Sequence, residues 1–140
     1  MKVFHTSPEE ITEIKNNGLF DDCLFFSAEE YAMGDVKAVY SLEISDNKII
    51  EVSDLDDTDT IDHIANVLDC TQDQAAELLS GEIRNAGEIT GDYEDDWFVQ
   101  AQQGSAAKAM GFDACESFDE QGTVYIIPMM GRENDLVRVK

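Results

Sequence analysis

VFHTSPEE, residues 3–10, combines the end of a strand with the start of a helix. Its two apolar residues lead to His5. Ser7 then occupies the position of a helix N-cap, with Pro8 in the first helical position and Glu10 where a capping box has its acid. We therefore expect a short strand that presents a histidine beside the N-terminus of a helix. A histidine at a strand end is more often a hydrogen-bonded structural residue than a catalyst, but its two ring nitrogens also suit a ligand hydroxyl.

FDEQGTVY, residues 118–125, places two carboxylates at a turn between apolar segments. More than a hundred residues separate this stretch from His5, so only a folded domain brings the two together. Adjacent strand residues point to opposite faces, so one of Asp119 and Glu120 is expected to face a given cleft. That carboxylate is either a solvated turn residue, or a group that binds a sugar hydroxyl and stabilises positive charge at the anomeric carbon.

The chain is strongly acidic, because 31 acidic residues against nine basic ones give a net charge of −22. Such a surface repels phosphates, so we expect no direct nucleic acid partner and no membrane partner. The charge is explained either by solubility or by mimicry of nucleic acid toward a basic partner. One domain spanning residues 1–140 is expected. No bilayer-length apolar run or secretory leader is seen, and three scattered cysteines suit a reducing cytoplasm.

Turn and cap residues divide the chain into strands at both ends and helices between them. An apolar strand followed by a serine cap occurs twice, which predicts a second helix start at Ser27. Expected helices then cover residues 60–69, 72–80 and 95–110. Expected strands cover residues 23–26, 36–44, 48–52, 112–118 and 123–128, with an edge strand at 137–139. The strand at 48–52 is expected to return after the one at 36–44. The layout is α+β, with a sheet that pairs N-terminal with C-terminal strands.

No metal site is expected. The acidic run at residues 54–59 suggests calcium, but it lacks the glycine of an EF-hand loop and has Ala65 where the bidentate glutamate belongs. His63 has no cysteine or histidine at zinc-ligand spacing. Tyr31 lies about one turn into the second expected helix, where it is either a packing residue or a platform for a planar ring.

Four motifs together resemble one family. They are FHTS at residues 4–7, FFS at 25–27 leading to Tyr31, GFD at 111–113 and DEQGTVY at 119–125. In this order they resemble small phage-encoded ADP-ribosyltransferases, and most of all the anti-CRISPR proteins that ADP-ribosylate the type I-F surveillance complex. The resemblance covers about the first forty and the last thirty residues.

The resemblance implies a split β-sheet core of the ADP-ribosyltransferase type, with NAD as co-substrate in a cleft between its halves. It implies that His5 binds the ribose on the adenosine side. Backbone groups beside it, at Thr6 and Ser7, would bind the amide of nicotinamide. No metal takes part.

The same resemblance implies the remaining site residues. Tyr31 and Phe26 would pack against the nicotinamide ring. Asp119 or Glu120 would bind the ribose on the nicotinamide side and stabilise the cation that forms as nicotinamide leaves. A nucleophile on a host bacterial protein, plausibly a subunit of the surveillance complex, would then attack C1′ in the host cytoplasm.

Two other functions remain open at this stage. The first is a non-enzymatic inhibitor whose acidic surface mimics nucleic acid and binds a basic partner, which would be sensitive to salt. The second is an NAD-hydrolysing toxin, which would use the same site with water as the nucleophile.

Overall fold

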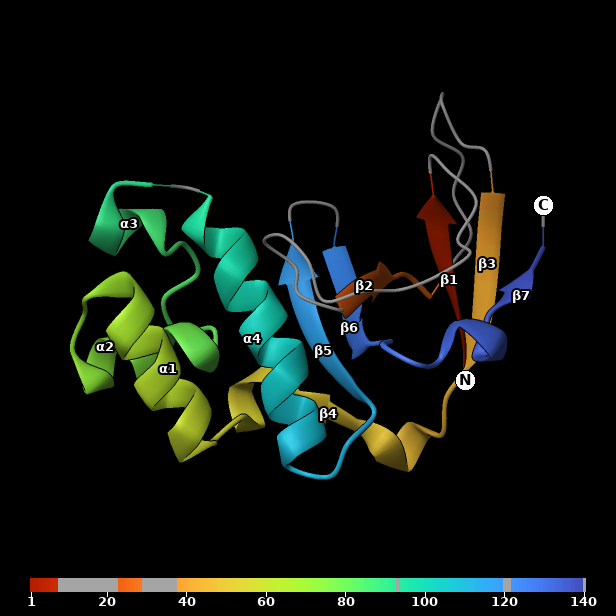
Figure 1. Cartoon of the computed structure of the whole chain (residues 1–140), viewed down its shortest axis with the longest axis horizontal. Coiled ribbons are helices and arrows are strands. Elements are labelled where there is room, and N and C mark those ends of the chain that lie inside the picture. The colour runs from red at the N-terminus through yellow and green to blue at the C-terminus, as the bar shows by residue number, and fades with distance from the viewer. Residues whose placement is uncertain (8–22, 29–37, 93, 120–121, 140) are drawn as a thin grey trace.

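Two sheets meet at the N-terminal strand, as Figure 1 shows. In this computed structural model, residues 1–7, 23–28, 38–92, 94–119 and 122–139 are described. The first sheet has the order β1-β3-β7, formed by Lys2–Ser7, Ala38–Glu43 and Val137–Arg138. The second has the order β2-β6-β5-β4, formed by Cys23–Phe26, Gly122–Pro128, Ala114–Asp119 and Ile49–Glu51.

Strands from the two ends of the chain pair with one another, as predicted. β2 runs antiparallel to β6, and β3 runs antiparallel to β7. β5 and β6 form the antiparallel hairpin expected around residues 120–122. The α+β class is therefore confirmed. The helices expected after Ser7 and Ser27 lie outside the described residues.

The expected return of residues 48–52 against β3 is wrong. After a 3-10 turn at Asp46–Lys48, the chain leaves the first sheet, and β4 joins the second sheet parallel to β5. Parallel pairing needs a long crossover, and the helices between these two strands supply it. The Lys48 carbonyl accepts a 2.8 Å bond from the backbone N–H of Asp113, and this bond fixes the start of β5 beside β4.

Local capping explains the helices of that crossover, α1 (Thr58–Leu68), α2 (Gln72–Leu79), α3 (Gly87–Thr90) and α4 (Asp95–Ala109). Asp57, from the acidic run, caps α1 by accepting a 3.1 Å bond from the N–H of Thr60. Thr71 and Gln74 form a capping box at the start of α2. The short α3 was not expected within residues 81–92. No described helix is both long and apolar enough to cross a membrane.

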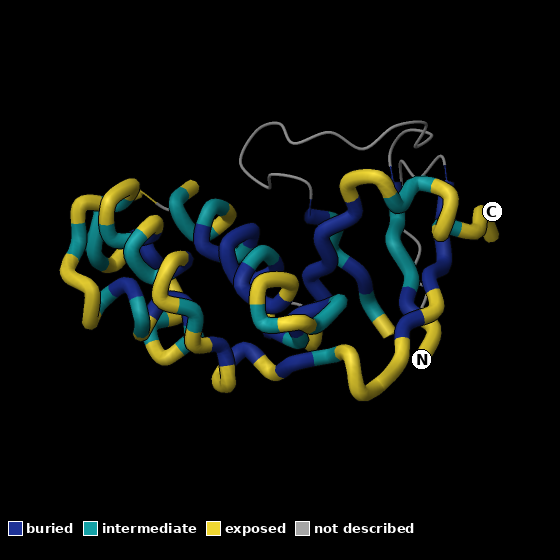
Figure 2. Tube along the Cα trace, turned by 60° about the horizontal axis from the view of Figure 1, so that its bottom comes forward, coloured by how far each residue is buried: buried dark blue, intermediate teal, exposed yellow. Residues whose placement is uncertain are grey.

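α4 covers one face of the second sheet, and the buried residues gather there in Figure 2. A large apolar core lies between this face and the helices. Gly104 lets the helix approach closely, because a Cβ there would lie 2.8 Å from Cys23 Sγ and 2.8 Å from Ile126 Cγ2. A smaller core, which includes Val3 and Phe26, lies where the two sheets meet.

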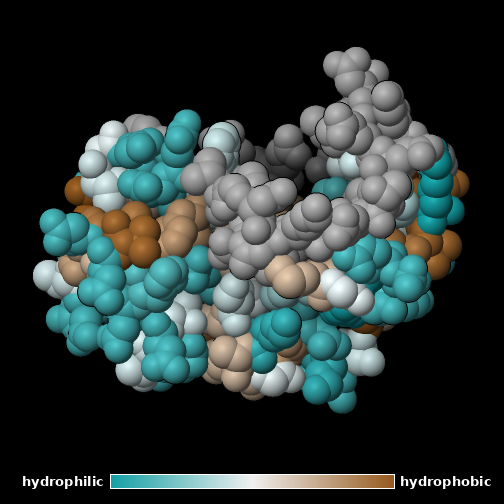
Figure 3. Space-filling model, viewed as in Figure 1, coloured by the Kyte–Doolittle hydropathy of each residue, from teal (hydrophilic) through white to brown (hydrophobic). Residues whose placement is uncertain are grey.

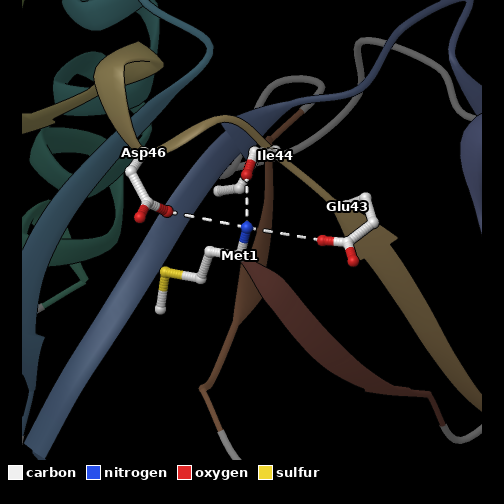
Figure 4. A network of polar contacts seen from close by, with 4 residues as sticks. All are labelled: Met1, Glu43, Ile44 and Asp46. Carbon is white, nitrogen blue, oxygen red and sulfur yellow. Dashed lines mark hydrogen bonds and ion pairs between the residues drawn. The ribbon is translucent and has the colours of Figure 1, made fainter.

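The start of β1 is tied to the segment that follows β3 (Figure 4). The Met1 amino group donates a 2.8 Å bond to the carbonyl of Ile44 and lies 3.4 Å from Glu43 Oε2 and 3.5 Å from Asp46 Oδ1. Both carboxylates are well exposed, so the ion pairs add little stability. The backbone bond extends the pairing of β1 with β3 by one position.

Gly104→Ala tests the close packing of α4. Alanine favours a helix by up to about 1 kcal/mol, but the clash with two buried side chains costs more, so the free energy of unfolding should fall by about 1–2 kcal/mol. Urea denaturation measures it. Ser105→Ala, at the next position of α4, is the control and should change stability by less than about 0.5 kcal/mol. Equal stability of Gly104→Ala and the wild type would contradict this packing.

Candidate functional site

Among the described residues, one backbone bridge connects the two sheets. The N–H of Phe4 donates to the carbonyl of Ser27, and the N–H of Ser27 donates to the carbonyl of Phe4, both at 2.8 Å. This isolated antiparallel bridge lies between β1 and the residue after β2. It brings the middle of β1 against the end of β2. His5 was predicted at the end of its strand, but β1 continues to Ser7.

His5 is fixed in one tautomer by this arrangement. Its Nδ1 lies 2.8 Å from the carbonyl oxygen of Phe25, and because a carbonyl only accepts, Nδ1 carries the proton. In the neutral ring Nε2 is then an acceptor. The imidazole also lies against Phe26, with ring centroids 5.5 Å apart and planes tilted by 51°. The structure thus places His5 beside Phe26, and the roles assigned to both residues in an NAD site stay predictions.

Burial sets the charge of this histidine. The pKa of His5 is lowered from its ordinary value, chiefly because burial disfavours the charged ring, although the bond to the Phe25 carbonyl acts in the opposite direction. The ring is therefore neutral near pH 7. A neutral imidazole with an acceptor at Nε2 suits a ligand hydroxyl, as the predicted ribose contact requires.

The two residues after His5 differ in orientation. Side chains alternate along β1, so Ser7 lies on the same face as Val3 and His5, and Thr6 lies on the other. Ser7 is buried. Any contact of Thr6 with a ligand on the face of His5 is therefore through its backbone, which is the contribution predicted for it. That contact stays a prediction.

Phe26 supports the histidine from within the smaller core. Its side chain is 1% exposed and pairs across the strands with Tyr125 of β6. A contact between Phe26 and nicotinamide stays a prediction, and so does the role of Tyr31, which lies outside the described residues.

The predicted carboxylates lie at the β5–β6 turn. Asp119 ends β5 opposite Gly122, which has a φ of +119° and begins β6. Glu120 lies outside the described residues. From Gly122 to Tyr125, the partner of Phe26, is three residues, or about 10 Å along a strand. The turn is therefore within reach of a dinucleotide held at His5.

A row of residues on β6 and β5 continues from Phe26, and the sequence analysis assigned no role to it. Tyr125 pairs with Phe26 on one side and with Glu116 on the other. The pKa of Tyr125 is raised, first by burial and then by the negative charges of Glu116 and Asp46, so the phenol keeps its proton. Only the register of the strands reveals this row, and register is not visible in the sequence.

Among the described residues, no group of three histidine, cysteine or acidic residues could hold a metal ion.

A groove of about 530 Å³ lies apart from His5. It runs along β3 and β7, and its charged residues are Lys2, Glu43, Arg132 and Asp135. By strand alternation, Lys2 lies on the face of β1 opposite His5.

Comparison with known proteins gives one family and one similar fold. The family model described as "Anti-CRISPR Type I-F ADP-ribosyltransferase AcrIF11" matches residues 1–133. A solved structure described as "Crystal structure of an anti-CRISPR protein" is similar, with a TM-score of 0.58 and 23% identity over 91% of this chain and 88% of that one. At that identity the likeness shows the fold alone. No curated protein matches the chain.

The lowered pKa of His5 predicts how stability changes with pH. The unfolded chain binds a proton at this group more readily than the folded one. The stability that His5 contributes is therefore complete above its ordinary pKa of 6.5 and is lost as the pH falls through the lowered value. Urea unfolding between pH 5 and pH 7.5 should show a steeper loss toward low pH for the wild type than for His5→Asn. An equally steep loss in both proteins would contradict the burial of a neutral ring.

Proposed function

The chain belongs to the family of the anti-CRISPR type I-F ADP-ribosyltransferase AcrIF11, and we propose that it modifies a protein subunit of a type I-F surveillance complex. The family predicted from the four motifs is confirmed by the match over residues 1–133. The chain is thus an NAD-dependent ADP-ribosyltransferase with anti-CRISPR function, and its target is a CRISPR-related protein. We further propose that it is phage-encoded and acts in the cytoplasm of the bacterial host.

The geometry of His5 is the observation that carries the proposed NAD site. Its proton is held on Nδ1 by the Phe25 carbonyl at 2.8 Å, which leaves Nε2 to accept a bond from a hydroxyl of the adenosine-side ribose. The backbone at Thr6 and Ser7 would bind the carboxamide of nicotinamide.

The chemistry requires a carboxylate at C1′ of the other ribose. As the bond from C1′ to the nicotinamide nitrogen breaks, its electron pair leaves with nicotinamide and positive charge develops on the sugar. A carboxylate at the β5–β6 turn, Asp119 or Glu120, would bind that ribose and stabilise the cation. A nucleophile of the target then forms a new bond to C1′ and gives up its proton. Tyr31, with Phe26, would hold the leaving ring.

Nearly half of the acidic residues of the chain lie in one segment between β4 and the start of α4. Residues 53–98 contain fourteen acidic residues and one basic residue. This segment includes α1, α2, α3 and the first turn of α4, and hydrophilic side chains cover most of the α1–α2 end in Figure 3. If the chain also acted as a nucleic acid mimic, this helical end would be the surface that contacts a basic partner, and salt would weaken the contact.

Labelled NAD with purified type I-F surveillance complex tests the proposed reaction. The wild type should label one protein subunit. Asp119→Asn combined with Glu120→Gln should lower kcat by about 10²–10³-fold, because the cation loses its stabilising charge. The two single variants identify which carboxylate acts. Labelling by the double variant at the wild-type rate would refute the site.

His5→Asn tests the ribose contact separately. It should raise the KM for NAD by about five- to tenfold, because one hydrogen bond to a hydroxyl is lost. His63→Asn is the matched control, since His63 is the other histidine of the chain, lies on α1 against Phe98 and is exposed. It should leave KM unchanged. Nicotinamide release that is independent of the complex would favour an NAD hydrolase, and inhibition without NAD would favour the acidic mimic.

A further inference from the structure

A buried glutamine connects three elements beneath the β5–β6 turn. Gln103 of α4 is 5% exposed. Its Nε2 donates to the carbonyls of Leu78 and Leu79, at 3.4 Å and 3.3 Å, in the last turn of α2. Its Oε1 accepts a 3.3 Å bond from the hydroxyl of Ser117 on β5, which is itself buried. A single side chain therefore links α4, α2 and β5.

Only an amide satisfies these contacts. The two carbonyls of α2 need a donor, and the Ser117 hydroxyl is directed at an acceptor, so the nitrogen and oxygen of Gln103 cannot be exchanged. A glutamate would place an oxygen against two carbonyls. A methionine would keep the length of the side chain but leave three buried polar groups without this partner.

The end of β5 has little other support among the described residues. β4 pairs with β5 only as far as Glu51 opposite Glu116. Residues 117–119 extend beyond β4, with β6 as their one described strand neighbour. The side chain of Phe118 in this overhang is 57% exposed. The bond from Ser117 to Gln103 thus anchors the overhang to the helices, two residues before Asp119.

We propose that Gln103 is a positioning residue for the transfer reaction: through Ser117 it holds the overhanging end of β5, and with it the backbone of Asp119, in place relative to β6. The role rests on the proposed function of the carboxylates at the turn. Gln103 touches neither NAD nor the target. It should affect the rate at which nicotinamide leaves more than the binding of NAD, because His5 lies on a different sheet.

Steady-state kinetics with NAD and the type I-F surveillance complex separate these effects. Gln103→Met should lower kcat by about tenfold or more, since a displacement of about 1 Å costs up to 10²-fold, while the KM for NAD stays within about twofold. Ser117→Ala, a milder change, should lower kcat in the same way. Ser117→Thr keeps the hydroxyl and should restore most of the rate. The double variant Gln103→Met with Ser117→Ala should be no slower than Gln103→Met.

Gln102→Met is the matched control, because Gln102 is the neighbouring buried glutamine of α4. It should retain the wild-type kcat even if its melting temperature falls as much as that of Gln103→Met. A folded Gln103→Met or Ser117→Ala enzyme with the wild-type kcat would overturn the positioning role alone. If Gln103→Met does not fold, the comparison of Ser117→Ala with Ser117→Thr tests the positioning role instead. A wild type that transfers nothing would instead overturn the proposed function, and the positioning role with it.

Discussion

Two backbone hydrogen bonds between Phe4 and Ser27 form the backbone bridge that connects the two sheets in the described part of the chain. On either side of this bridge β1 pairs with β3 and β2 pairs with β6, so the two sheets diverge from it. The edge of β2 then has no complete strand beside it among the described residues. Backbone groups at a sheet edge still need partners, and the carbonyl of Phe25 finds one in the side chain of His5.

This bond shows why both interpretations of His5 are compatible. The sequence left a choice between a structural histidine and a ligand-binding one. Nδ1 completes the edge of β2, which is a structural role, and the same bond determines that Nε2 is an acceptor. Burial lowers the pKa of His5 and keeps the ring neutral, so the structural contact prepares the proposed ribose contact.

The sequence predicted most elements and the pairing of N-terminal with C-terminal strands, but not the partner of β4 or the register of the strands. Helical periodicity located α1 and α2, an apolar run located β2, and alternation located β3, because those patterns depend on neighbouring residues. β4 was assigned the wrong partner. The sequence of residues 48–52 does not show that the chain comes back, after the helical crossover, to pair β5 with β4. Tyr125 and Gln103 were missed for the same reason, since their roles depend on register and on contacts across the fold. The motifs at both ends of the chain were sufficient to identify the family. The arrangement of the site residues could be described only once the strand pairing was known.

Part of the net charge of −22 lies far from the proposed site of the anionic co-substrate. Fourteen of the 31 acidic residues occur between residues 53 and 98, a segment that includes α1, α2 and α3, and these three helices contact α4. In Figure 1, α4 and the second sheet lie between these helices and β1. Exposed charges farther apart than about 8 Å are largely screened at physiological salt. The field at His5 therefore depends on nearby groups more than on the total charge, so the acidic helical end does not oppose the NAD site proposed at His5.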